Sequence, residues 1–119
     1  MKRDRRAYPW DMVQASRAVQ GFLGAADLGR YEADLMLRSA VERQLQILGE
    51  ALIQLAKLDP MLAARVPRHR QLIGFRNALV HGYAALNDAE VWRVSHENLP
   101  ELHEALVSLL NELDPDAPR

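Results

Sequence analysis

The stretch from Gly74 to Tyr83, GFRNALVHGY, places four side chains that can do chemistry inside an otherwise apolar run. Arg76 is a permanently charged guanidinium whose planar fork can donate to two phosphate oxygens at once. His81 exchanges protons near neutral pH, and Asn77 and Tyr83 add hydrogen-bonding groups. Together they indicate a site for an anion, and phosphate matches the arginine best.

If this stretch is a helix, Arg76 lies in the middle of its apolar face. At about 100° per residue, Tyr83 falls about 20° from Arg76 and two turns further along. An unpaired charge cannot point into a dry core, because its desolvation is far too costly. Three arrangements stay open: a buried carboxylate partner, a subunit interface, or a cleft that receives an anion. The third suits a guanidinium best.

His81 does not share that face. In an ideal helix it lies about 140° round from Arg76 and about 7.5 Å along the axis, so the two side chains diverge. They can converge on one ligand through a distortion at the helix end, near Gly82, or through a second copy of the chain across a dimer. Asn77 lies one turn before His81 and flanks the arginine.

The chain has the size and composition of a single cytosolic domain. Its 119 residues suit one core, and 49% hydrophobic with 26% charged residues is an ordinary balance for a folded protein. There is no cysteine, no secretory signal and no apolar run of about 18 residues. We therefore expect one cytoplasmic domain over residues 1–119, with residues 1–7 and 114–119 flexible.

The net charge of −1 conceals a basic segment. Between Pro60 and Asn87 there is no acidic residue, but there are four arginines: Arg65, Arg68, Arg70 and Arg76. A basic patch on a mildly acidic body suggests a face that meets an anion such as phosphate. The alternative is that these arginines pair with carboxylates from other helices.

Apolar residues spaced three and four apart predict helices along nearly the whole chain, with no alternation typical of strands. We expect a first helix with Pro9 in its first turn, and a long second helix from near Gly29 to just before Pro60. The connector between Pro60 and Pro67 should hold at most a short turn of helix.

The second half of the chain predicts two further helical segments. One runs from about Arg68 through GFRNALVHGY. Asn87 and Asp88 cap the next, and Pro100 should kink it or divide it in two. The predicted fold is an all-α, antiparallel bundle of four to five helices with a kinked last helix.

Three stretches, in order, resemble the HEPN superfamily and its HepT-like branch. GFRNALVHGY matches the HepT pattern of Arg, four residues, His, any residue and Tyr. VERQLQILGEAL (residues 41–52) resembles the family's long second helix with its Gly-Glu-Ala. AEVWRVSHENLPEL (residues 89–102) resembles the helix that follows the motif. The resemblance covers most of the chain.

The resemblance implies a HEPN-type bundle that forms a homodimer, with the two motifs facing a shared cleft. It also implies a metal-independent endoribonuclease without a cofactor. The RNA 2′-hydroxyl attacks the adjacent phosphate and leaves a 2′,3′-cyclic phosphate and a 5′-hydroxyl. In that chemistry Arg76 holds the phosphate, His81 handles the protons, and Asn77 orients one or the other.

The resemblance further implies a toxin of a toxin–antitoxin pair, with tRNA suggested as the RNA cleaved. The antitoxin would be an MntA-like nucleotidyltransferase that transfers AMP to Tyr83. The rival interpretation is a non-catalytic HEPN module that binds a nucleotide or RNA, or that scaffolds a nucleotidyltransferase.

Structural roles for the same residues stay open. Arg76 could form an ion pair with Glu50 or Glu42, His81 a hydrogen bond at the helix end, and Tyr83 a packing contact. We expect no metal site, because the histidines that could share a face lie on either side of Pro100 and lack a third ligand: His96 and His103.

Overall fold

Helices make up all the regular structure in the computed structural model, which describes residues 3–82 and 87–117. In chain order they are α1 (Ala7–Leu23), α2 (Leu28–Ala33), α3 (Leu35–Leu58), α4 (Pro60–Ala63), α5 (His69–His81), α6 (Asp88–Arg93), a π-helical turn η1 (Val94–Asn98) and α7 (Leu99–Leu113). The predicted all-α bundle is confirmed. No helix within the described residues is long and apolar enough to cross a membrane.

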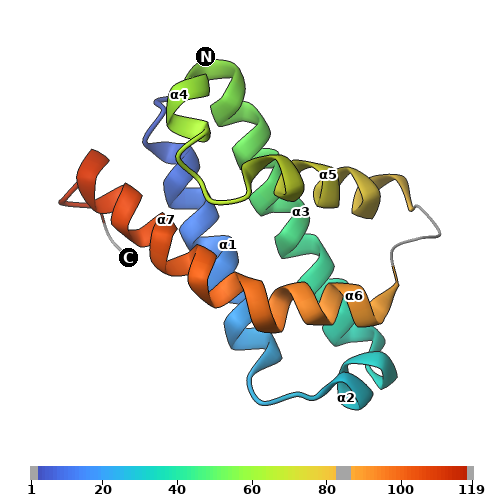
Figure 1. Cartoon of the computed structure of the whole chain (residues 1–119). Coiled ribbons are helices and arrows are strands. Elements are labelled where there is room, and N and C mark those ends of the chain that lie inside the picture. The colour runs from blue at the N-terminus through green and yellow to red at the C-terminus, as the bar shows by residue number, and fades with distance from the viewer. Residues whose placement is uncertain (1–2, 83–86, 118–119) are drawn as a thin grey trace.

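The antiparallel pair α1 and α3 forms the centre of the bundle (Figure 1). The C-terminal helix α7 packs across α1, and α5 packs on α3. Each long central helix turns a stripe of residues spaced three or four apart toward the others, as the sequence predicts. Fully buried members of this core include Met12, Val19, Val41, Leu52, Leu55, Leu106 and Leu110.

The long helix begins later than the predicted start near Gly29. Asp34 has an extended backbone, and its carboxylate accepts a hydrogen bond from the N–H of Leu37. Asp27 caps α2 in the same way, through the N–H of Arg30. Because each aspartate satisfies an N–H that a helix start leaves without a partner, the chain divides into a short α2 and a separate α3.

The last helical segment is capped by Asn87, as predicted, and shows what happens around Pro100. The Asn87 side chain accepts from the N–H of Glu90 and caps α6. Pro100 sits in the first turn of α7, where it needs no N–H donor. The π-turn comes just before it, with the N–H of Leu99 donating to the carbonyl of Val94. The segment therefore stays helical from Asp88 to Leu113, and the α-helical pattern is interrupted only by the π-turn before Pro100.

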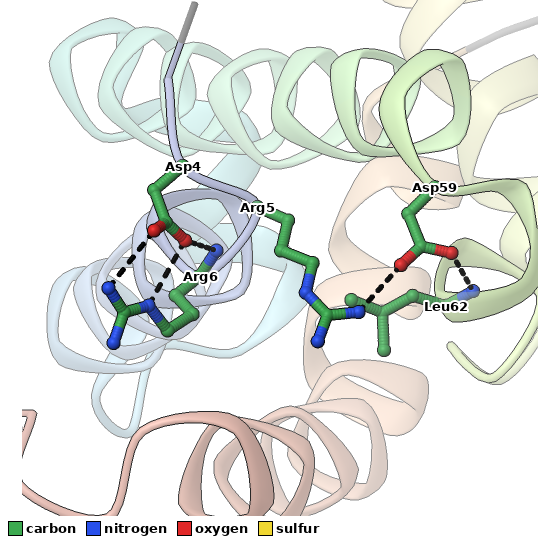
Figure 2. A network of polar contacts seen from close by, with 5 residues as sticks. All are labelled: Asp4, Arg5, Arg6, Asp59 and Leu62. Carbon is green, nitrogen blue, oxygen red and sulfur yellow. Dashed lines mark hydrogen bonds and ion pairs between the residues drawn. The ribbon is translucent and has the colours of Figure 1, made fainter.

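Polar contacts hold the N-terminal arm against the junction of α3 and α4 (Figure 2). The Arg5 guanidinium lies 2.9 Å from the Asp59 carboxylate, which also accepts from the N–H of Leu62 and so caps α4. These bonds lower the pKa of Asp59, the Leu62 N–H more than Arg5. Asp4 pairs with Arg6 within the arm. The predicted flexibility of residues 1–7 and 114–119 stays a prediction.

Helices α3 and α5 approach closely where α3 has a glycine. A Cβ placed on Gly49 would lie 2.3 Å from the Cβ of Arg76 and 2.6 Å from its Cγ. Real Cβ atoms do not come that close, so any larger residue must push α5 away from α3. The glycine in the middle of a long helix is therefore explained by the arginine stem that crosses it.

We predict that Gly49→Ala lowers the free energy of unfolding by about 1–3 kcal/mol, because overpacking separates the two helices. Urea unfolding measures the change. Gly21→Ala is the matched control, since Gly21 lies within α1 and has nothing within 4 Å of an added Cβ. There the removal of a helix-interior glycine should stabilise by up to about 1 kcal/mol. Equal effects from both substitutions would contradict the close-contact explanation.

A serine and a histidine join α1 to α7. Ser16 is fully buried, and its Oγ lies 2.6 Å from the Nδ1 of His103. The same hydroxyl donates a hydrogen bond to the carbonyl of Val13. Burial lowers the pKa of His103, and the positive charge of Arg17 lowers it further. The folded protein therefore favours the neutral imidazole.

We predict that this histidine makes the protein less stable in mild acid. Its folded pKa lies below the unfolded value of about 6.5, so the unfolded chain binds the proton first and stability falls as the pH drops through that range. Urea midpoints between pH 8 and pH 5 should fall more steeply for the wild type than for His103→Gln. Parallel curves would show that His103 does not contribute.

Candidate functional site

Helix α5 lies on the flank of the bundle, with α3 as its main neighbour (Figure 1). None of its thirteen residues is fully buried. Its apolar side chains pack against the core but stay partly exposed: Leu72, Ile73, Phe75 and Leu79. Val80 is 46% exposed. The helix that carries the reactive side chains therefore leaves much of its surface open to solvent.

Arg76 is held by two side chains at the α3–α5 contact. Its Nη2 lies 2.6 Å from Oε2 of Glu50, and its Nη1 donates to Oδ1 of Asn77 at 3.0 Å. The Arg76 side chain is 24% exposed and that of Glu50 is 46% exposed. Of the three arrangements open from the sequence, a carboxylate partner is therefore present, but water reaches it.

The position of Glu50 is itself fixed. Its second oxygen, Oε1, accepts from Nε2 of Gln54 one turn later on α3 at 3.0 Å. The chain Gln54–Glu50–Arg76–Asn77 thus links α3 to α5 through polar side chains. Such a chain sets the orientation of the guanidinium plane, which matters because a guanidinium recognises phosphate through paired, directional donors.

The Arg76 guanidinium has N–H donors left over after these two hydrogen bonds. A guanidinium has five N–H groups, and the bonds to Glu50 and Asn77 use two of them. Nε of Arg76 is buried and has no hydrogen-bond partner within the described residues. The other unused donors are one N–H on each of Nη1 and Nη2, and these are the groups that an anion could use.

His81 is the last residue of α5 and is exposed. Gly82 follows it with φ of 65°, and its N–H donates to the carbonyl of Ala78, which ends the helix. Because α5 stays helical through His81, the distortion that could have turned His81 toward Arg76 is absent from this described helix. The structure brings Asn77 to Arg76 within one chain, but not His81.

Tyr83 lies outside the described residues, so its predicted position beside Arg76 stays a prediction. Glu42, the other candidate partner of Arg76, lies elsewhere. It lines a hollow with Leu79 and Asp88 near the C-terminal end of α5. Burial raises the pKa of Glu42, and the charge of Asp88 adds to this rise.

Among the described residues, two of the four arginines of the basic segment form ion pairs with carboxylates and two do not. Arg65 pairs with Glu112 at 2.5 Å, and Arg76 pairs with Glu50, as the ion-pair alternative expects. Arg68 and Arg70 are exposed, and neither side chain has an ion pair within residues 3–82 and 87–117. Positive charge therefore remains at the start of α5.

The two C-terminal histidines face different surroundings. His96 stacks on Trp92, with the ring centroids 4.7 Å apart, whereas His103 contacts Ser16 in the core. Among the described residues no group of three histidines and carboxylates is placed to hold a metal ion.

Sequence reasoning missed the roles of Gly49 and Gln54. The signal for Gly49 was available, because a glycine inside an otherwise strong helix needs a packing reason. Gln54 gave no such signal: a glutamine four residues from a glutamate on a helix surface is common.

Comparison with known proteins identifies the family of the chain. The family model described as Ribonuclease HepT-like matches residues 12–109. "Putative RNase MJ1380" of Methanocaldococcus jannaschii is 29% identical over 101 residues, covering 85% of this chain and 92% of the relative. "Probable ribonuclease HepT" of Thermococcus cleftensis is 26% identical over 102 residues, covering 86% and 92%. No solved structure matches. These matches confirm the endoribonuclease predicted from the motif, and the chain belongs to the HepT-like ribonuclease family.

Proposed function

We propose that this ribonuclease works as a homodimer that cleaves RNA without a metal ion, using Arg76 and His81 at a cleft between the two copies. The observation that carries the proposal is the anchored arginine. Glu50 and Asn77 hold the Arg76 fork at a surface that water reaches, with donors to spare. A guanidinium held in one orientation can stabilise the charge that develops on a phosphate during attack.

The reaction needs only proton transfers and charge stabilisation. The RNA 2′-hydroxyl attacks the adjacent phosphorus, and its proton passes to a neutral His81. Arg76 neutralises the extra negative charge on the phosphorane. The bond to the 5′-oxygen then breaks, and that oxygen takes up a proton from a protonated His81 as it leaves. The products are a 2′,3′-cyclic phosphate and a 5′-hydroxyl.

A second copy supplies what one chain lacks. Within one α5, Arg76 and His81 point in directions about 140° apart. A two-fold axis beside the open face of α5 would place His81 of one protomer near Arg76 of its partner. It would also cover the partly exposed apolar side chains of α5, such as Ile73 and Val80.

We further propose that the protein is a cytoplasmic toxin, neutralised by an MntA-like nucleotidyltransferase antitoxin, with tRNA as the expected substrate. The proposal for the antitoxin rests on the family motif, in which Tyr83 is the AMP acceptor. Added phosphate near the cleft would repel RNA and compete for Arg76.

The dimer cleft is tested by combining two inactive variants. We predict that His81→Ala and Arg76→Ala homodimers each lose about 10²-fold or more of RNA cleavage, since acid–base help alone contributes about 10²–10⁴. Heterodimers purified through two different tags should recover about half of the wild-type rate. One of their two sites then holds an intact Arg76 and an intact His81 from different protomers.

Two controls accompany this test. Cleavage by the wild type should persist in excess EDTA, and both variants should melt near the wild-type temperature. If the heterodimers are inactive, the Arg76 and His81 that act together belong to the same chain. Full activity of His81→Ala would reject the catalytic role and favour a module that only binds RNA.

The antitoxin reaction makes a separate prediction at Tyr83. Co-expression with the nucleotidyltransferase should raise the intact mass of the chain by one or more AMP units, all on that tyrosine. Tyr83→Phe should still arrest growth but escape neutralisation, because only the acceptor oxygen is removed. Silenced toxicity without any mass increase would mean that the antitoxin acts by binding alone.

A further inference from the structure

A hollow between the N-terminal arm and the middle of α3 opens beside the anchored arginine. Its lining includes Arg3, Tyr8, Arg43, Ile47, Glu50 and Gln54. Glu50 belongs both to this hollow and to the ion pair with Arg76. Whatever occupies the hollow is therefore separated by the Glu50 carboxylate from the guanidinium that we assign to the scissile phosphate.

The charges in this hollow leave one arginine without a partner. Asp11, which also lines it, lies 2.7 Å from Arg3, and Glu50 is paired with Arg76. Arg43 is exposed on α3, and its side chain has no ion pair or hydrogen bond within the described residues. It lies seven residues before Glu50, hence on the same face of α3 and about 10 Å along its axis.

The rest of the lining suits a nucleobase. The guanidinium of Arg3 lies over the ring of Tyr8, 5.0 Å from its centroid, and is held there by Asp11. Bases stack on aromatic rings and on arginine planes. Ile47 adds an aliphatic side chain, and the amide of Gln54 can donate to or accept from a base edge.

We propose that this hollow is an RNA subsite that binds the nucleotide next to the cleaved bond. The base packs on the Arg3 guanidinium, which lies over the Tyr8 ring, and Arg43 binds a flanking phosphate. The Arg5–Asp59 pair positions this arm, because it ties the residues just after Arg3 to the start of α4. The subsite rests on the ribonuclease function proposed above, and it adds recognition of the RNA strand on the side of α3 that faces α1.

The test measures binding of a short single-stranded RNA to full-length protein carrying His81→Ala, so that cleavage does not interfere. In this background Arg43→Gln should raise the Kd about tenfold, as expected for a lost charge-assisted contact. It should also reduce the slope of log K against log salt by about 0.7, the value for one phosphate contact on a single strand.

Matched variants separate the subsite from general effects of charge. Arg30→Gln removes another exposed arginine, on α2, outside the hollow, and should change the Kd by less than about twofold. Tyr8→Leu should weaken binding about tenfold, whereas Tyr8→Phe should keep it, because the ring supports the Arg3 plane on which the base packs. Equal effects of Arg43→Gln and Arg30→Gln would overturn the proposal.

Three further outcomes distinguish the alternatives. Arg43-dependent binding of free AMP, without an Arg43 effect on RNA, would make the hollow a mononucleotide site and reject the RNA subsite. His81-dependent cleavage with no Arg43 effect on RNA affinity would remove the subsite alone and leave the ribonuclease proposal standing. Absence of both RNA binding and RNA cleavage in the wild-type protein would reject both.

Discussion

The contact of Arg76 with Gly49 and Glu50 is the constraint on which the site depends. A guanidinium on the apolar face of α5 must be compensated wherever that face meets α3. Two consecutive residues of α3 meet the two requirements. Gly49 leaves room for the arginine stem, and Glu50 supplies a carboxylate at the edge of the contact, where water can still enter. The result is a charged group that is fixed in place without being sealed in a dry core.

Fixing Arg76 against α3 also determines what the rest of the motif can do. With the arginine turned toward α3, the regular helix carries His81 to another face, and Gly82 ends the helix before any change of direction. A single chain therefore presents Arg76 and His81, the proposed phosphate-binding and proton-transfer groups, on different faces of α5. This physical reason favours a dimer more strongly than the exposed apolar residues of α5 do, since scattered exposed apolar side chains are common on protein surfaces.

Local rules predicted most of the helices, and tertiary contacts decided the rest. The spacing of Val41, Leu45, Leu48, Leu52 and Leu55 was sufficient to predict the central helix, because burial of such a stripe stabilises any amphipathic helix. The break at Asp34 was missed, although aspartate favours a helix cap over a helix interior, so this signal was available in the sequence. The sequence could not predict that Arg76 pairs with Glu50 and not with Glu42. Both glutamates lie on α3, and only the position of α5 along that helix distinguishes them.

The uneven distribution of burial explains why function belongs on this flank. Helices α1, α3 and α7 bury complete apolar stripes and form a stable core, whereas α5 buries no residue fully. A helix with so little burial gains limited free energy from the rest of its own chain. Additional stabilisation can come from the ion pair, from a second copy or from RNA, and each of these acts on the face that holds Arg76. In the proposed dimer, RNA binding and dimerisation should therefore order α5 together, so that the arginine is most rigid when the substrate and the partner protomer are both present.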